Sequence, residues 1–156
     1  MRVLFLDVDG VLNHRGVFVP GNGASPLCEK CVERLARLVE RTSASVVLSS
    51  TWRLGGKHSE HVQKLKDAGV LNRAHDDWRT IDMPLNDDAI VVPYSQRRGA
   101  EIAEWLGRHP EVTRYAIVDD DSDMLPEQLP FFVQTTFDTG IQDDHVERIV
   151  SILDGE

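Results

Sequence analysis

The sequence predicts an α/β fold in which helices cover both faces of a central, mostly parallel sheet. Short apolar runs alternate with longer stretches whose apolar residues recur at helical spacing, a pattern typical of strands followed by helices. Two of the apolar runs, at 3–6 and 115–118, end directly in aspartates. Ligands bind at the carboxyl ends of parallel strands. The 156 residues are enough for one domain with one core, so we expect a single domain over residues 1–156.

The first half of the chain is expected to contain a strand, a Gly- and Asn-rich loop or small flap, a helix, a strand and a helix, at 2–6, 13–25, 26–41, 45–48 and 58–68. Pro26 suits the first turn of the first helix. Gly69 follows the second helix and ends it. The stretch 70–95 is mostly polar from Asn72 to Asp88, and we expect no more than one short strand there.

The second half is expected to contain a helix, a strand, a short turn or helix, a strand and a final helix, with the regular elements at 96–108, 114–118, 131–135 and 142–153. In the first of these helices the residues predicted to face inward are Gly99, Ile102, Ala103 and Leu106. The last helix is predicted to bury Val146, Ile149, Val150 and Leu153. Asp143 and Asp144 favour its N-terminus, where the helix dipole attracts negative charge. The candidates for a small lid are 13–25 and 54–95.

Composition and charge argue against several classes of protein. The formal net charge is −9, which argues against broad, charge-driven binding to nucleic acid or to anionic membranes. No apolar stretch approaches the length that spans a bilayer, and we see no signal-peptide pattern. Cys28 and Cys31 are spaced like half a zinc site or a redox pair. Because they lie on a helical apolar stripe and no second pair exists, we interpret them as free buried thiols, which fit a reducing cytoplasm.

Two groups of acids follow the apolar runs that we expect to be neighbouring strands. Asp7 and Asp9 follow the first run, and 119–123 (Asp-Asp-Asp-Ser-Asp) follows the second. Carboxylates that converge at a poorly screened sheet edge repel one another unless a divalent cation lies between them. Carboxylate and carbonyl oxygens are ligands that suit Mg²⁺. The sequence therefore predicts a magnesium site at this edge.

Four stretches of the chain resemble the motifs of the haloacid dehalogenase-like (HAD) superfamily. They occur in the family's order, as 7–13 (Asp-Val-Asp-Gly-Val-Leu-Asn), 48–53 (Leu-Ser-Ser-Thr-Trp-Arg), Arg98-Gly99 and Asp119-Asp120. The finer pattern, which includes Arg-Gly-Ala-Glu-Ile-Ala-Glu-Trp-Leu and a late Thr-Gly-Ile, is similar to the small HAD domain of Swiss Army Knife RNA repair proteins. The resemblance implies a three-layer Rossmannoid, HAD-like fold with a minimal cap or none.

The resemblance also implies a phosphatase that works through an aspartyl-phosphate intermediate. Asp7 would be the nucleophile, and Asp9 would be the general acid and then the base. An aspartate at position 9, rather than Thr or Ser, favours a phosphatase over a dehalogenase or an ATPase. Ser49 would hydrogen-bond a phosphoryl oxygen, and Arg98 would neutralise phosphate charge.

The metal ligands implied by the resemblance are Asp7, the backbone carbonyl of Asp9, Asp119 and Asp120. Asp120 is the direct ligand if the last motif is paired acids. Asp119 is the direct ligand if the motif is Asp-x-x-x-Asp ending at Asp123.

Three further residues, Gly10, Ser50 and Arg53, are predicted to bind substrate. Two of them have plainer interpretations, since Ser50 would also serve as a helix cap and Arg53 as a surface charge. Trp52 and Trp105 are interpreted as packing aromatics, and His14 as a surface residue.

We therefore expect a Mg²⁺-dependent phosphomonoesterase with an open site. The likeness to RNA repair domains favours a nucleic-acid end phosphate, whereas the acidic net charge favours a nucleotide or another small phosphate ester. Local cations for an end phosphate are available from Arg15, Arg53, Arg79, Arg97 and Arg98. The alternatives are a protein phosphatase of the same chemistry and a non-catalytic Mg²⁺-binding module. The intact Asp7 and Asp9 argue against the second alternative.

Overall fold

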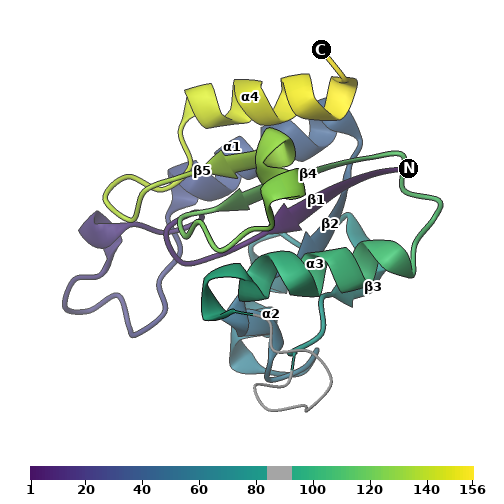
Figure 1. Ribbon diagram of the computed structural model, residues 1–156. Coiled ribbons are helices and arrows are strands. Elements are labelled where there is room, and N and C mark those ends of the chain that lie inside the picture. The colour runs from purple at the N-terminus through teal and green to yellow at the C-terminus, as the bar shows by residue number, and fades with distance from the viewer. Residues whose placement is uncertain (84–92) are drawn as a thin grey trace.

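The computed structural model describes residues 1–83 and 93–156, which fold around one five-stranded sheet (Figure 1). Its strands are β1 (Arg2–Leu6), β2 (Ser45–Leu48), β3 (Ala74–Arg79), β4 (Arg114–Asp119) and β5 (Phe132–Gln134). The strand order is β3-β2-β1-β4-β5, and every neighbouring pair is parallel. The predicted mostly parallel sheet is confirmed, and β3 is the one short strand expected in the polar stretch.

The register of the three central strands brings the predicted motifs into line. Leu6 of β1 is paired with Leu48 of β2 on one side and with Val118 of β4 on the other. The residues that follow these positions are Asp7, Ser49 and Asp119. The chain extends to one side of β1 through β2 and β3, and to the other side through β4 and β5. Such a switch point leaves a crevice at the carboxyl end of the sheet, where α/β proteins bind ligands.

Helices lie on both faces of the sheet, which gives the three layers predicted for the fold. The helices are α1 (Glu29–Thr42), α2 (Glu60–Asp67), α3 (Arg97–Gly107) and α4 (Asp143–Asp154). In Figure 1, α1 and α4 cover one face and α3 covers the other. Among the described residues, the chain between β1 and α1 forms no regular element except the 3₁₀ turn Arg15–Val17. This agrees with a minimal cap.

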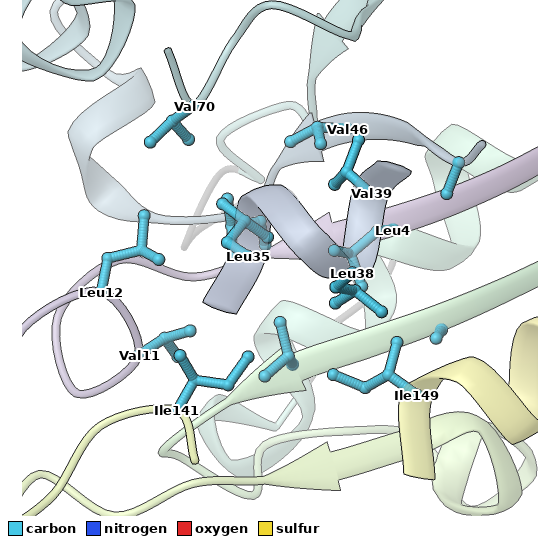
Figure 2. Packing of buried hydrophobic residues seen from close by; sticks show 14 of the residues in the cluster. Leu4, Val11, Leu12, Leu35, Leu38, Val39, Val46, Val70, Ile141 and Ile149 are labelled. Atoms are coloured by element: carbon cyan, nitrogen blue, oxygen red, sulfur yellow. The ribbon is translucent and has the colours of Figure 1, made fainter. Parts of the chain in front are cut away.

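Alternate residues of β1, β2, β4 and β5 enter two separate cores. Leu4 of β1 packs with Leu38 of α1 and Ile149 of α4 in the larger core, which Figure 2 shows from close by. Phe5 points to the opposite face, where its ring meets the Trp105 ring of α3 edge-on at 5.3 Å between centroids. Because both faces are covered, the central strands are apolar throughout instead of alternating with polar residues.

Two details of the predicted helices were wrong. The first helix begins at Glu29 instead of Pro26, because the backbone at 26–28 bonds the preceding loop: the Pro26 carbonyl accepts from the Asn13 amide and the Cys28 N–H donates to the Leu12 carbonyl. Ala103 is exposed. Glu101 takes its place as a buried residue of α3, paired with an arginine.

The cysteine prediction holds for Cys31 but only partly for Cys28. Cys31 is buried among apolar residues, and burial raises the pKa of its thiol to about 12. Cys28 is half-buried at the N-cap of α1.

Part of the predicted lid region is regular structure. Of the stretch 54–95, the described residues form α2, β3, their short connections and the start of the 3₁₀ turn Tyr94–Gln96, while 84–92 lies outside the described residues, so a lid there stays a prediction. No helix in the described part of the chain is long and apolar enough to cross a membrane.

Candidate active site

Three aspartates converge where β1 and β4 end. One carboxylate oxygen from each of Asp7, Asp119 and Asp120 lies within 4.8 Å of the other two. The parallel pairing of β1 with β4 causes this, since Asp7 and Asp119 follow the paired residues Leu6 and Val118. Asp119 is fully buried and Asp7 nearly so. The two acidic clusters predicted to meet at one sheet edge do meet there.

Arg98 is the cation of this cluster. Its Nη1 lies 3.0 Å from Asp7 Oδ1 and 3.3 Å from Asp119 Oδ2, and it donates to the Ser49 carbonyl at 2.7 Å. The first turn of α3 carries Arg98. Gly99 lets this turn pack closely against the backbone of Leu125, because a Cβ on Gly99 would overlap that backbone.

Asp123 anchors the same turn of α3. Its carbonyl accepts the Gly99 N–H at 3.0 Å, and its carboxylate accepts the Arg98 N–H at 3.4 Å. It therefore acts on the site through Arg98.

The electrostatics of the cluster disfavour three ionised carboxylates. Burial raises the pKa of Asp119 to about 9 and that of Asp120 to about 6, and the nearby Asp7 charge adds to both shifts. Burial also raises the pKa of Asp7, although the adjacent Arg98 guanidinium opposes this. One guanidinium does not balance three carboxylates, so a divalent cation would complete the charge balance.

The donor set fits Mg²⁺. All three side chains offer carboxylate oxygens, which is the chemistry that Mg²⁺ selects. Asp119 Oδ2 is buried and accepts no hydrogen bond from the described residues, and Asp119 Oδ1 is used by the Asp121 N–H at 3.0 Å. Arg98 Nη1 lies 3.3 Å from this oxygen but donates no hydrogen bond to it, and a bound cation would supply the partner that the oxygen lacks. Both candidates for the direct ligand, Asp119 and Asp120, lie in the cluster.

Ser49 follows β2 at the same level of the sheet as Asp7 after β1 and Asp119 in β4. Its hydroxyl has no hydrogen-bond partner among the described residues. Its N–H donates to the Leu6 carbonyl at 3.0 Å, as if it continued the sheet. Its Oγ is buried and has no hydrogen-bond partner among residues 1–83 and 93–156. Native structures rarely leave a buried hydroxyl unpaired, and a catalytic or ligand-binding role is one explanation for such a group.

Asp9 is turned toward two donors that the sequence analysis did not assign to the site. Asn13 Nδ2 donates to Asp9 Oδ1 at 2.8 Å, and Trp52 Nε1 donates to Asp9 Oδ2 at 3.1 Å. The side chain of Asp9 is not one of the three converging carboxylates. The interpretation of Trp52 as a packing aromatic was therefore incomplete. Only its place within Ser-Ser-Thr-Trp-Arg, beside Ser49, signalled a role.

Arg53 does not have the geometry of a substrate clamp. It is 3% exposed, and all five of its N–H groups bond the protein, at Glu101 Oε2 and at the carbonyls of Ser49, Ser50, Thr80 and Ile81. Burial lowers the pKa of Arg53, and its ion pair with Glu101 opposes the shift. No N–H remains for a phosphate, so we assign Arg53 a structural role beneath the loop that carries Ser49.

Ser50 and Gly10 also serve the shape of the site. The Ser50 hydroxyl accepts the Trp52 N–H at 3.2 Å as the N-cap of a 3₁₀ turn, which matches its plainer interpretation. Gly10 has φ +78°, and a Cβ there would overlap the Asp120 carboxylate. The Thr135 hydroxyl donates to the Gly10 carbonyl at 2.6 Å. Glycine is thus needed for both the turn and the close approach of Asp120.

A cavity of about 630 Å³ opens beside Arg98. Thr51, Tyr94, Arg97 and Ser122 contribute to its lining. Arg98 lines this cavity and also contacts the Asp7 and Asp119 carboxylates, so the cavity adjoins the cluster.

A second group of possible metal ligands, His75, His109 and Glu111, lies away from these strand ends. The Asp77 N–H donates to His75 Nδ1 at 3.0 Å, which leaves the proton of neutral His75 on Nε2. That nitrogen lies 3.8 Å from Glu111 Oε1 and is a donor, not a ligand. We assign no metal to this group.

Comparison with known proteins agrees with the geometry. The family model described as "HAD domain in Swiss Army Knife RNA repair proteins" matches residues 3–146, which include all four motifs. No curated protein matches the chain.

Proposed function

Because the chain belongs to the family of HAD domains in Swiss Army Knife RNA repair proteins, we propose that it is a Mg²⁺-dependent phosphomonoesterase. The observation that carries this proposal is the contact of Asp7 with Arg98 beside Asp119 and Asp120, at the carboxyl edge of the sheet. A carboxylate held beside a guanidinium and a cation site is suited to attack a phosphate whose negative charge would otherwise repel it.

Asp7 is the proposed nucleophile. Its carboxylate oxygen forms a bond to phosphorus, and the bond from phosphorus to the leaving oxygen breaks. Asp7, Asp119 and Asp120 would hold Mg²⁺, which would shield the charge of the phosphoryl group as that group reacts. Arg98, in the first turn of α3, contacts Asp7 and offers its remaining N–H groups to phosphoryl oxygens. The unpaired Ser49 hydroxyl donates to another phosphoryl oxygen.

Asp9 is the proposed proton carrier. In the first step it gives its proton to the leaving oxygen, which departs as an alcohol. In the second step it takes a proton from a water molecule as that water attacks the phosphorus bound to Asp7. The bond between phosphorus and Asp7 then breaks, which releases inorganic phosphate and leaves Asp9 protonated for the next cycle.

The proposed substrate is a phosphate at the end of a nucleic acid or on a nucleotide. The matching family model describes a HAD domain in RNA repair proteins, and the cavity beside Arg98 has room for the group that carries the phosphate. The net charge of −9 restricts cationic contacts to local groups such as Arg97 and Arg98. The alternative is a protein phosphatase with the same chemistry, which would release phosphate fastest from a phosphopeptide.

The test is phosphate release with and without Mg²⁺ from nucleoside 3′- and 5′-monophosphates, 3′- and 5′-phosphorylated RNA and DNA oligonucleotides, p-nitrophenyl phosphate and a phosphopeptide. Asp7→Asn is the blank, because it removes the nucleophile with little change in shape. We expect Mg²⁺-dependent release that Asp7→Asn abolishes and that is fastest for nucleotide or oligonucleotide phosphates. If folded protein that binds Mg²⁺ releases phosphate from none of them, the chain is a binding module and the proposal fails.

A further inference from the structure

The carboxylate of Asp9 is bound on both of its oxygens. The Trp52 indole N–H donates to Oδ2 at 3.1 Å across 43 residues of chain, and the Asn13 amide donates to Oδ1 at 2.8 Å. The two donors come from different segments, the turn after β2 and the loop after β1. A carboxylate held at both oxygens has one orientation about its terminal torsion, where a free aspartate has a broad range.

Trp52 is itself held in place. It is 4% exposed, and its backbone N–H bonds the Ser50 hydroxyl at 3.2 Å. Its ring packs against the His61 ring of α2, with 4.7 Å between the ring centroids and 37° between the planes. His61 Nε2 in turn lies 3.0 Å from the Ser25 hydroxyl. The direction of the indole N–H is therefore set by the 3₁₀ turn on one side and by α2 on the other.

The amide of Asn13 is equally restricted. Its Oδ1 accepts the Gly10 N–H at 2.9 Å, so its Nδ2 must point the other way, where it donates to Asp9 and to the Pro26 carbonyl at 3.1 Å. The side chain is fully buried. A single residue thus sets both the turn at Gly10 and the orientation of Asp9.

We propose that Trp52 and Asn13 are positioning residues that aim the proton of Asp9 at the leaving oxygen. This rests on the proposed function, in which Asp9 is the general acid. An indole N–H and an amide NH₂ donate and do not accept hydrogen bonds. When Asp9 is protonated, its proton cannot be taken up by either neighbour. The proton of Asp9 must therefore occupy a carboxylate lone pair that faces neither donor. From there it can be donated to the leaving oxygen of the substrate.

Leaving-group dependence separates positioning from simple packing. An alkoxide such as the ribose oxygen of a nucleotide needs a proton to leave, whereas p-nitrophenolate departs readily without one. Trp52→Phe keeps an aromatic ring beside His61 and removes the N–H. We expect kcat for a nucleoside monophosphate to fall about tenfold to a hundredfold, and kcat for p-nitrophenyl phosphate to change by less than about threefold.

Trp105→Phe is the matched control. It makes the same chemical change in α3, where the Trp105 indole donates to the Asp77 carbonyl at 3.1 Å and packs in the other core, away from Trp52. Trp105→Phe should change kcat for both substrates by the same factor. Asp9→Asn should lower kcat for the nucleoside monophosphate more than Trp52→Phe does, and should again affect p-nitrophenyl phosphate less.

The contact has a readout that does not depend on turnover. The indole ¹H–¹⁵N resonance of Trp52, identified by its absence in Trp52→Phe, should move in Asp9→Asn, and the resonance of Trp105 should not. Equal losses on both substrates in Trp52→Phe would overturn the positioning role, as would an unmoved Trp52 resonance. If the wild-type protein hydrolyses neither substrate, the proposed function itself fails, and the positioning role fails with it.

Discussion

Arg98 Nη1 lies 3.0 Å from Asp7 Oδ1, although the two residues are 91 positions apart in the chain. Asp7 directly follows β1 and Arg98 lies in the first turn of α3, so the contact exists only when the sheet and the helix layer over it are both formed. The same nitrogen donates to the Ser49 carbonyl and faces Asp119. One guanidinium therefore joins the ends of β1, β2 and β4, and the active site forms together with the fold.

Magnesium should stabilise the protein more as pH rises. The pKa of Asp119 is raised from 3.8 to about 9 and that of Asp120 to about 6, so the metal-free folded state binds more protons than the unfolded chain in that window. Its stability therefore falls as pH rises from about 4 to 9, while ionised carboxylates bind the cation better. We expect saturating Mg²⁺ to raise Tm by about 5 °C or more at pH 9 and by much less at pH 5.

The measurement is thermal unfolding across pH with Mg²⁺ and with a chelator. Asp119→Asn should lose both the gain in Tm and part of the pH dependence of the metal-free protein. A gain in Tm that does not vary with pH would contradict the cation site.

Neighbouring serines should respond oppositely to alanine substitution. Ser49→Ala removes a buried hydroxyl that has no partner among the described residues, so stability should hardly change while kcat/KM falls about tenfold to a hundredfold. Ser50→Ala removes the cap of the turn that carries Trp52, so the free energy of unfolding should fall by about 1 kcal/mol. Urea denaturation and steady-state kinetics on both variants decide this. The assignment is wrong if Ser49→Ala is the less stable variant and keeps full activity.

A methyl group on Gly10 should damage the metal site. Gly10→Ala forces a side chain onto a backbone with φ +78° and into the Asp120 carboxylate. Gly23→Ala imposes nearly the same φ, +77°, with nothing within 4 Å of the added carbon. Both should lose about 1 kcal/mol of stability from backbone strain, but only Gly10→Ala should also weaken Mg²⁺ binding, about tenfold or more. Calorimetric titration with Mg²⁺ measures the difference, and equal affinities would refute it.

The buried pair of Arg53 and Glu101 should matter for stability. The Arg53 guanidinium donates to Glu101 Oε2 at 2.9 Å, and both residues are 3% exposed. Glu101→Gln leaves a buried cation without its counter-charge and should lower the free energy of unfolding by about 3 kcal/mol. The exposed Arg41–Glu147 pair is the control, since Arg41→Ala should change stability very little. Similar losses in the two variants, measured by denaturant unfolding, would show that Glu101 is not the counter-charge that Arg53 requires.

The sequence predicted the sheet and the convergence of the acids because both follow from local patterns. An apolar run ending in Asp7 and another ending in Asp119 must place both aspartates at one edge if the strands are parallel neighbours. The polar β3 was expected only as a possible strand, because its residues are half-buried or exposed and lack the apolar run of a central strand.

What the sequence could not supply was the direction of individual side chains. Arg53 was interpreted as a substrate clamp or a surface charge, yet it is buried, and the carbonyls around it and Glu101 use every N–H it has. Trp52 looked like packing, yet one atom of its ring bonds Asp9. Contacts of this kind join segments tens of residues apart and leave no periodic trace in either segment. They depend on the packing of α2 and α3 around the ends of the strands.

The most direct test of the central claim is to look for the phosphoryl group on Asp7. The protein is mixed with Mg²⁺ and substrate, quenched in acid during turnover, and digested with trypsin, which releases residues 3–15 as one peptide. Mass spectrometry should find this peptide heavier by one phosphoryl group, with the modification on Asp7, and the adduct should vanish in Asp7→Asn. Phosphate release at full rate by Asp7→Asn, or a phosphoryl group on another residue, would contradict the account.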